Sequence, residues 1–383
     1  MRGSFCFTGA EILKDEEFKR TPFCFENGVI TPNGKINVDL SDFWILPGII
    51  DLHGDGFEHH LNPRPSAPFD MQLGLQSAER ELSVNGITTA YFAQAYSWEG
   101  GYKSPSYATR LLKSLYEHRQ NFLTDIRVQI RYEILMSEHI DEIINLVKAC
   151  NVSYLVYNNH IPVAQQLWKD FPERIENWAI KSSRTGSELI AVVDELSEGT
   201  PGIKKKLNGL YQQLKKFDIT IGSHDDSTRG ERSYFHSIGA TICEFPTSIE
   251  TAKHARSLGN SIIMGAPNVV RGGSQSGSIP ATDLIKLGLC DALVSDYYYP
   301  ALVNAVWTLR DSGLVKFEKA WALISSGPAK ALNLKNKGKL DFGYCADFVI
   351  LNPRRRLIEA TFCKGLPSYM SGTFAATVLE KMQ

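Results

Sequence analysis

Eight short β-rich runs alternate with longer polar or amphipathic stretches through the middle of the chain. The runs occupy residues 44–53, 87–94, 126–135, 152–157, 218–224, 240–245, 261–266 and 291–296. Helix-like segments lie between several of them, at Met71–Val84, Tyr107–Arg119, Asp141–Ala149, Ile161–Ile180 and Ser248–Leu258. Strands that alternate with helices favour parallel β/α units, and eight is the strand number of a closed barrel. We therefore expect an α/β fold, a TIM-type (β/α)8 barrel.

The competing architecture is an open doubly wound sheet. No G-x-G-x-x-G motif or P-loop follows any of the runs, which weakens that alternative. The two ends of the chain differ from its middle: Asn27-Gly28 and Pro32–Gly34 punctuate short strand-like pieces, which is hairpin chemistry, and residues 338–352 have a similar pattern. We expect residues 1–44 and 331–383 to form one small β-sandwich domain, and residues 45–330 to form the barrel.

Composition excludes several classes of partner. Hydrophobic residues make up 43% of the 383 residues and charged residues 22%, which are ordinary globular values. A net charge of −1 argues against nucleic acid held on a basic face and against an acidic membrane surface. No apolar stretch approaches the roughly 18–20 residues that span a bilayer, and the N-terminus lacks a signal-peptide core. The seven cysteines are dispersed without C-x-x-C spacing, so we expect reduced thiols and a cytoplasmic protein.

Residues that can bind a metal fall at the ends of five predicted strands. They are His53, Asp55, Glu133, His160, His224 and Asp296. The active site of a β/α barrel lies at the carboxyl ends of its strands, and imidazole with carboxylate suits Zn²⁺, Mn²⁺ or Fe²⁺. His53 and Asp55 are two residues apart in an extended segment, so both side chains point to the same side.

Each of these residues also has a structural interpretation. A single histidine at a strand end is more often solvated or capped than a ligand, and an aspartate after a strand is commonly a helix N-cap. Taken alone, Asp296 before Tyr297 would be such a cap, and Glu133 could pair with Arg131 or Arg127. The hypothesis of a metal site rests on the agreement of five strand ends.

Several segments carry a resemblance to known families. ILPGIIDLHGD resembles the first-strand motif of the amidohydrolase superfamily, with His-x-Asp in place of the commoner His-x-His. Residues 46–65, 222–252 and 264–302 resemble the PhnM family of phosphonate metabolism. That family hydrolyses α-D-ribose 1-methylphosphonate 5-triphosphate to the 5-phosphate and pyrophosphate. Gly56, Val163 and Gln275 depart from the family pattern.

The resemblance implies a site with two divalent metal ions, Zn²⁺, Mn²⁺ or Fe²⁺. His53 and Asp55 would hold one ion, and His160 and His224 the other. Glu133 would bridge the two ions, and Asp296 would take the proton from the bridging water. A metal-dependent diphosphatase of the PhnM type is therefore the leading hypothesis.

A triphosphorylated sugar also needs positive charge from the protein. Arg271 lies in a glycine-rich stretch that can form an anion nest, and Arg64 and Arg229 lie in loops after predicted strands. A solvated loop arginine is the alternative for each. We expect a small anionic phosphorylated sugar as the partner, and a homo-oligomer. An amidohydrolase that cleaves a C–N bond, as a cyclic amidase or deaminase, is the second hypothesis, and a catalytically inactive binding protein is the third.

Overall fold

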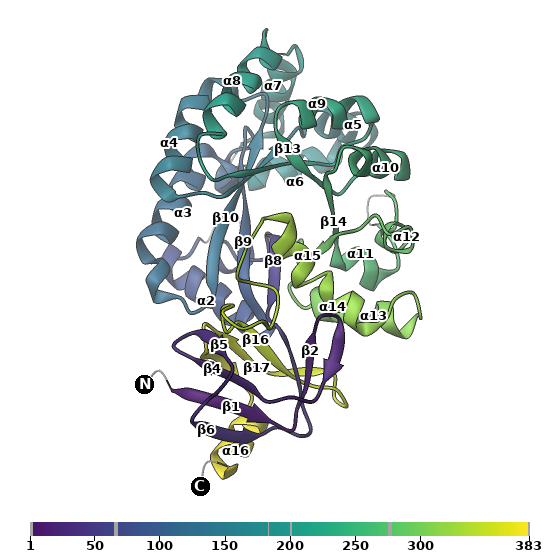
Figure 1. The fold of residues 1–383 in the computed structure, drawn as a ribbon. Helices are drawn as coiled ribbons and strands as arrows, with labels where there is room; N and C mark the ends of the chain where they lie inside the picture. Colours follow the sequence, from purple (N-terminus) through teal and green to yellow (C-terminus); the bar gives the residue numbers. More distant parts are fainter. Residues whose placement is uncertain (1–2, 65–67, 183, 200, 275–277, 382–383) are drawn as a thin grey trace.

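The computed structural model describes residues 3–64, 68–182, 184–199, 201–274 and 278–381. Its central feature is an eight-stranded parallel sheet in the order β15-β14-β13-β12-β11-β10-β9-β8, drawn at the upper end of the molecule in Figure 1. The strands are β8 (Ile49–Gly54), β9 (Ile87–Tyr96), β10 (Asp125–Glu133), β11 (Tyr154–Asn158), β12 (Thr220–His224), β13 (Ala240–Glu244), β14 (Ser261–Gly265) and β15 (Ala292–Val294). The expected barrel is confirmed.

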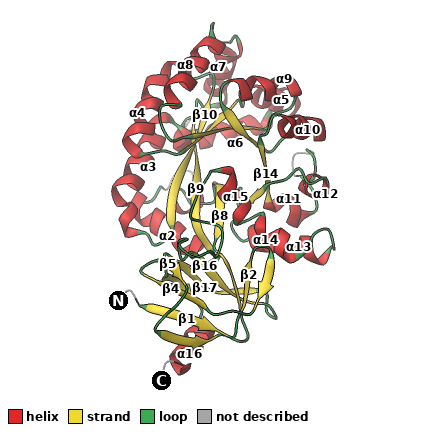
Figure 2. Cartoon of the chain, in the orientation of Figure 1, coloured by secondary structure: helices red, strands yellow, loops and turns green. Residues whose placement is uncertain are grey.

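Helices pack around this sheet (Figure 2), and the last of them also contributes Ala329 to the cluster inside the barrel. They are α1 (Glu58–Leu61), α2 (Met71–Val84), α3 (Pro105–His118), α4 (Ile140–Cys150), α5 (Ile161–Asp170), α6 (Glu173–Lys181), α7 (Gly186–Ser197), α8 (Ile203–Leu214), α9 (Arg229–Ser237), α10 (Ile249–Ser257), α11 (Ala266–Arg271), α12 (Ala281–Lys286), α13 (Ala301–Asp311), α14 (Phe317–Ala322) and α15 (Ser326–Ala331). Three 3₁₀ turns follow β9, α3 and β10: η1 (Gly101–Lys103), η2 (Arg119–Asn121) and η3 (Ser137–His139).

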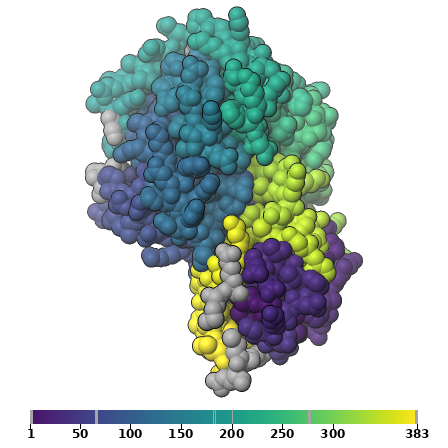
Figure 3. Space-filling model, turned by 60° about the vertical axis from the view of Figure 1, so that its left-hand side comes forward, coloured from purple at the N-terminus to yellow at the C-terminus, as the bar shows by residue number. Residues whose placement is uncertain are grey.

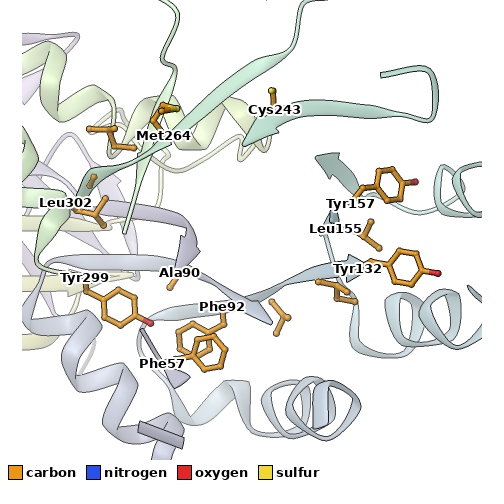
Figure 4. Packing of buried hydrophobic residues seen from close by; sticks show 14 of the residues in the cluster. Phe57, Ala90, Phe92, Tyr132, Leu155, Tyr157, Cys243, Met264, Tyr299 and Leu302 are labelled. Atoms are coloured by element: carbon orange, nitrogen blue, oxygen red, sulfur yellow. The ribbon is translucent and has the colours of Figure 1, made fainter. Parts of the chain in front are cut away.

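Alternation along each strand separates the barrel interior from the outer layer. On β11, Tyr154 and Val156 belong to the cluster that fills the barrel, whereas Leu155 and Tyr157 pack toward the helices (Figure 4). Side chains of a strand alternate between faces with a period of two, so one strand can serve both layers. In the outer layer the rings of Phe57 and Phe92 stack 4.4 Å apart.

The barrel closes through a short contact between β8 and β15. Gly54 and Asp296 form an isolated parallel bridge. Below it, the buried carboxylate of Asp51 accepts hydrogen bonds from the backbone N–H of Ser295 at 3.0 Å and from its Oγ at 2.5 Å. The Asp51 side chain therefore supplies hydrogen bonds at the seam between β8 and β15, where backbone pairing is limited to one bridge.

Two predicted elements are divided in the structure. The first run splits into β7 (Trp44–Pro47) and β8, with Gly48 between them. A Cβ at Gly48 would lie 2.4 Å from Thr88 Oγ1, so the chain turns there with its backbone against β9. The helix expected over 161–180 is interrupted before Pro172, which lacks the N–H to continue it, and becomes α5 and α6.

Both chain termini build a β-rich domain beneath the barrel, where purple and yellow residues pack together in Figure 3. It contains β1 (Ser4–Thr8), β2 (Glu11–Lys14), β3 (Glu17–Lys19), β4 (Phe23–Glu26), β5 (Val29–Thr31), β6 (Ile36–Asp39), β16 (Phe348–Asn352), β17 (Leu357–Cys363), β18 (Leu366–Met370) and α16 (Gly372–Lys381). One sheet has the order β5-β4-β1-β6, and the other has β18-β17-β16-β7-β2-β3. A shared cluster that includes Phe7, Phe25 and Phe348 joins them. The expected boundaries after residue 44 and before residue 331 stay a prediction.

Of the two expected turns, one forms a hairpin. Asn27 and Gly28 both have positive φ, at 51° and 84°, and connect the antiparallel strands β4 and β5. Two central residues with positive φ are typical of a type I′ turn. The prediction of a hairpin at Pro32–Gly34 is wrong. The flanking strands β5 and β6 are not neighbours in the sheet, and β6 pairs in parallel with β1.

The structure also corrects the expectation that all cysteines are free thiols. Cys6 on β1 and Cys24 on β4 are direct cross-strand partners, and their sulfurs are bonded. The other five cysteines are free. Among the described residues, no helix combines the length and the apolar character needed to cross a membrane.

Candidate functional site

The predicted ligands gather at the carboxyl ends of the barrel strands. His53 lies near the end of β8, Glu133 ends β10 and His224 ends β12. His160 follows β11 and caps α5. The ring of His224 lies 5.3 Å from that of His53 and 6.4 Å from that of His160, between centroids. The barrel therefore brings together three histidines that are far apart in the sequence.

One group of possible metal ligands consists of His53, His224 and Glu244. An atom of each lies within 4.8 Å of the others. Glu244 ends β13 and is fully buried, and its Oε2 lies 2.8 Å from His53 Nδ1. Burial would lower the pKa of His53, but the Glu244 carboxylate outweighs burial and raises it. This bond occupies Nδ1, so Nε2 is the ring nitrogen of His53 that can face a ligand.

Glu244 is itself held by two further donors. Gln129 Nε2 and the Tyr154 hydroxyl each donate to its Oε1 at 2.6 Å. All these side chains are buried in the barrel. A carboxylate that receives three such bonds has a fixed orientation, and it fixes the histidine ring bound to it.

The second group consists of Glu99, Glu133 and His160, again within 4.8 Å of one another. Glu133 contacts His160 Nδ1 through Oε1 and accepts a hydrogen bond from the His160 backbone N–H at 3.1 Å. Glu99 follows β9 and accepts from Lys103 Nζ at 2.8 Å and from Trp178 Nε1 at 2.6 Å. Both carboxylates are buried.

Asp55 and Asp296 lie at the seam of the barrel. The backbone N–H of Asp296 donates to His53 O at 3.0 Å, and its carbonyl accepts from the Asp55 N–H at 2.8 Å. Asp296 has a φ of 56°, in the left-handed region that aspartate tolerates better than most residues. Burial raises its pKa to about 6. The Asp55 carboxylate lies 3.8 Å from Arg131 Nη1 and is in neither three-residue group.

His224 has its own acidic neighbour. Its Nδ1 lies 3.0 Å from Asp225 Oδ2, and Asp225, like Asp296, has a positive φ of 59°. Burial lowers the pKa of His224. For Asp225 burial acts in the opposite direction, but the attraction of His224 outweighs it and holds the pKa at about 2.

A cavity of about 280 Å³ lies beside His224 and the barrel seam. Its described walls include His224, three carboxylates and two guanidinium groups: Asp55, Asp225, Asp296, Arg131 and Arg271. Arg271 ends α11, and its Nη1 donates to the Tyr297 hydroxyl at 3.3 Å. A second cavity of about 340 Å³ has His160, Glu99, Lys103 and Arg174 in its walls.

The other predicted arginines lie elsewhere. Arg229 begins α9, where its side chain is exposed and lies 3.9 Å from Glu250. Arg64 is exposed in the loop after α1. Of the three predicted arginines, only Arg271 is among the described residues in the walls of the two cavities. Gln275 lies outside the described residues.

Sequence reasoning missed Glu244, Glu99 and Arg131 as parts of the site. Glu244 had a usable signal, since it ends a β-rich run in the same way as His224. Arg131 also had one, because it lies two residues before Glu133 and so faces the same side of β10. Glu99 lies three residues after the end of β9, where no strand periodicity applies.

Comparisons with known proteins agree with this architecture. Residues 207–378 match the model of the amidohydrolase family. The chain is 30% identical over 314 residues to the α-D-ribose 1-methylphosphonate 5-triphosphate diphosphatase of Escherichia coli (strain K12), which covers 80% of this chain and 82% of that protein. A putative prolidase from Bifidobacterium longum has a TM-score of 0.66 at 13% identity, covering 100% of this chain and 99% of its own. A β-aspartyl dipeptidase from Fervidobacterium islandicum AW-1 has a TM-score of 0.61 at 13% identity, covering 97% of each chain.

Together, the barrel with its histidines and carboxylates and the family match define a hydrolase of the amidohydrolase superfamily. Within that superfamily, the long match to the diphosphatase places the chain in the PhnM family.

Proposed function

We propose that this protein is a metal-dependent diphosphatase that releases pyrophosphate from α-D-ribose 1-methylphosphonate 5-triphosphate or a related triphosphorylated sugar. The relative from Escherichia coli supports the substrate class by its name. The observation that carries the proposal is the convergence of two histidine–carboxylate groups and two arginines at one end of the barrel. The expected homo-oligomer and cytoplasmic location stay predictions.

The donor set fits divalent metal ions. Each three-residue group mixes imidazole and carboxylate, which suits Zn²⁺, Mn²⁺ or Fe²⁺. The Nδ1–carboxylate contact of His53 matches the outer support usual for metal-binding histidines. We propose that His53, Asp55, His160 and His224 would hold two such ions and that Glu133 would be shared between them. When bound, such ions lower the pKa of water and neutralise charge on phosphoryl oxygens.

The protein's own residues supply the remaining steps. Asp296 is placed by two backbone hydrogen bonds at the barrel seam, and its carboxylate accepts a proton from the attacking water. The water oxygen forms a bond to the phosphorus nearest the sugar, and the bond from that phosphorus to the oxygen that bridges it to the second phosphorus breaks. Pyrophosphate leaves, and the sugar keeps one 5-phosphate. Arg271 neutralises part of the polyphosphate charge.

Phosphorus NMR of the metal-loaded protein with a ribose 5-triphosphate compound tests the proposal. We expect pyrophosphate and a 5-phosphate signal to appear together. Elemental analysis of protein purified without chelator is expected to find close to two divalent ions per chain, and fewer in His53→Asn. Absence of phosphate products from every triphosphate tested, together with amine or ammonia release from an amide or a base, would replace the proposal with C–N hydrolysis.

A further inference from the structure

Arg131 lies in the middle of the site without a structural hydrogen-bond partner. It occupies β10 between Gln129 and Glu133, and all three face the barrel interior because they are two residues apart. Its side chain is 13% exposed. The nearest carboxylate oxygen, on Asp55, is 3.8 Å from Nη1, and Nε is buried without a partner. Within the described residues, no side-chain hydrogen bond of Arg131 is present.

Two other arginines of the barrel have a guanidinium that is held by hydrogen bonds within the protein: Arg232 is fully buried, and the side chain of Arg127 is 33% exposed. Arg232, which is fully buried, donates four hydrogen bonds, to Ser223 Oγ, Asp226 Oδ2 and two backbone carbonyls. Arg127, four residues before Arg131 on the same strand, donates two bonds to Asp125 and one to the Tyr91 hydroxyl. Burial of a charged donor costs free energy unless it is paired and hydrogen-bonded. Arg131 has the Asp55 carboxylate at 3.8 Å but, in the described part of the chain, none of the side-chain hydrogen bonds that Arg127 and Arg232 make.

A guanidinium stays protonated in proteins, so Arg131 is a cation. The Asp55 carboxylate oxygen lies 3.8 Å from its Nη1, which is too long for a hydrogen bond. The result is a fixed positive group with unused N–H donors in the wall of the 280 Å³ cavity.

We propose that Arg131 is a substrate-binding residue whose guanidinium donates to phosphoryl oxygens at the inner end of the cavity. The inference rests on the proposed function, because it needs a phosphorylated substrate in that site. Arg271 lines the same cavity from α11, on a different element, so the two arginines contact the polyphosphate from different sides. An arginine fork matches two anionic oxygens at once, and an ammonium cannot reproduce that geometry.

The test is binding of inorganic pyrophosphate to the metal-loaded protein, measured by titration calorimetry. Loss of a charge-assisted contact costs about 1.5–3 kcal/mol, which corresponds to roughly ten- to a hundredfold in affinity. We expect Arg131→Gln to weaken pyrophosphate binding by that factor and Arg131→Lys to recover part of it. Metal content by elemental analysis is expected to equal that of the wild type in both variants. Pyrophosphate should raise the melting temperature of the wild type more than that of Arg131→Gln.

Arg127→Gln is the matched control, since it removes from the same strand a guanidinium that is held by hydrogen bonds to Asp125 and Tyr91. We expect it to lower the melting temperature and to leave pyrophosphate affinity unchanged. Exposed Arg354 provides a second control, and Arg354→Gln should change neither quantity.

Three results separate the inference from the proposed function. Wild-type pyrophosphate affinity in Arg131→Gln, with turnover intact in the wild type, overturns the role of Arg131 alone. Loss of metal in both Arg131 variants overturns it as well, because the residue then supports the metal site. Absence of pyrophosphate binding and of turnover in the metal-loaded wild type overturns the proposed function itself.

Discussion

Asp296 combines a backbone role with the chemical role proposed for its side chain. Its main chain bridges β8 and β15, while its carboxylate faces the cavity. Asp296→Asn keeps the shape and the backbone bonds but removes the basic oxygen. We expect pyrophosphate release to fall by about 10²–10⁴-fold, as for a lost general base, with metal content retained. Steady-state kinetics measures the rate, and elemental analysis measures the metal content. Activity within a few-fold of the wild type would mean that Asp296 has only a structural role.

Glu244 contacts His53, so in the proposed mechanism it would act through that histidine. Its oxygens are occupied by His53, Gln129 and Tyr154. Glu244→Gln preserves the volume but replaces an acceptor with a donor, which disturbs the tautomer of His53. We expect metal affinity to fall roughly 10- to 100-fold, the usual effect of losing such a partner. A competition titration with a metal-binding dye measures the change, and excess metal should restore activity.

The exposed carboxylate of Glu250 is the control for that experiment. Glu250→Gln should retain the wild-type affinity for metal. Unchanged affinity in Glu244→Gln would instead show that His53 is oriented by the packing of β8.

At the scale of elements, the seam between β8 and β15 depends on Asp51. β15 is only three residues long. The Asp51 carboxylate accepts hydrogen bonds from the backbone N–H and the hydroxyl of Ser295, which follows β15. Asp51→Ala leaves a buried N–H without a partner, which costs about 1–3 kcal/mol. We expect a lower free energy of unfolding in urea for Asp51→Ala and a smaller loss for Asp51→Asn, which keeps one acceptor oxygen. Equal losses in the two variants would mean that the seam does not depend on that acceptor.

At the scale of the whole molecule, Lys337 ties the barrel to the β-rich domain. Its Nζ lies 2.6 Å from Asp347 Oδ2, just before β16, and 3.3 Å from Asp125 Oδ2, at the start of β10. Burial would raise the pKa of Asp125, but Lys337 and Arg127 outweigh burial and lower it from 3.8 to about 2. The ionised form is therefore more favourable in the folded state than in the unfolded chain.

The sign of the resulting pH dependence follows from that lowered pKa. The stabilisation by Asp125 is complete above its unfolded value of 3.8 and is lost as pH falls toward 2. It corresponds to about 2 kcal/mol. We expect Asp125→Asn to be less stable than the wild type at pH 6 and to show a smaller difference near pH 2, in urea unfolding series. Exposed Asp42→Asn should follow the wild type throughout, and a constant difference for Asp125→Asn would contradict the linkage.

The order of the elements and much of the site could be predicted from local patterns alone. Alternating strands and helices predicted the barrel, and the rule that sites lie at carboxyl strand ends pointed to His53, Glu133, His160, His224 and Asp296. Asn27-Gly28 predicted its hairpin because positive φ at two consecutive residues is a local requirement. These features depend on neighbouring residues, so the sequence by itself determined them.

Other features depend on which distant strands become neighbours. Glu244 reaches His53 across 191 residues, because the closed barrel places the ends of β8 and β13 around one interior. Strand order and register also decide the parallel pairing of β6 with β1, the Cys6–Cys24 bond and the place of Arg131 Nε, which is buried without a hydrogen bond. No local propensity encodes these contacts, since each is decided by the packing of the whole chain. Sequence alone therefore determined the elements and the residue types at the strand ends, and only the tertiary structure decided which of those residues meet.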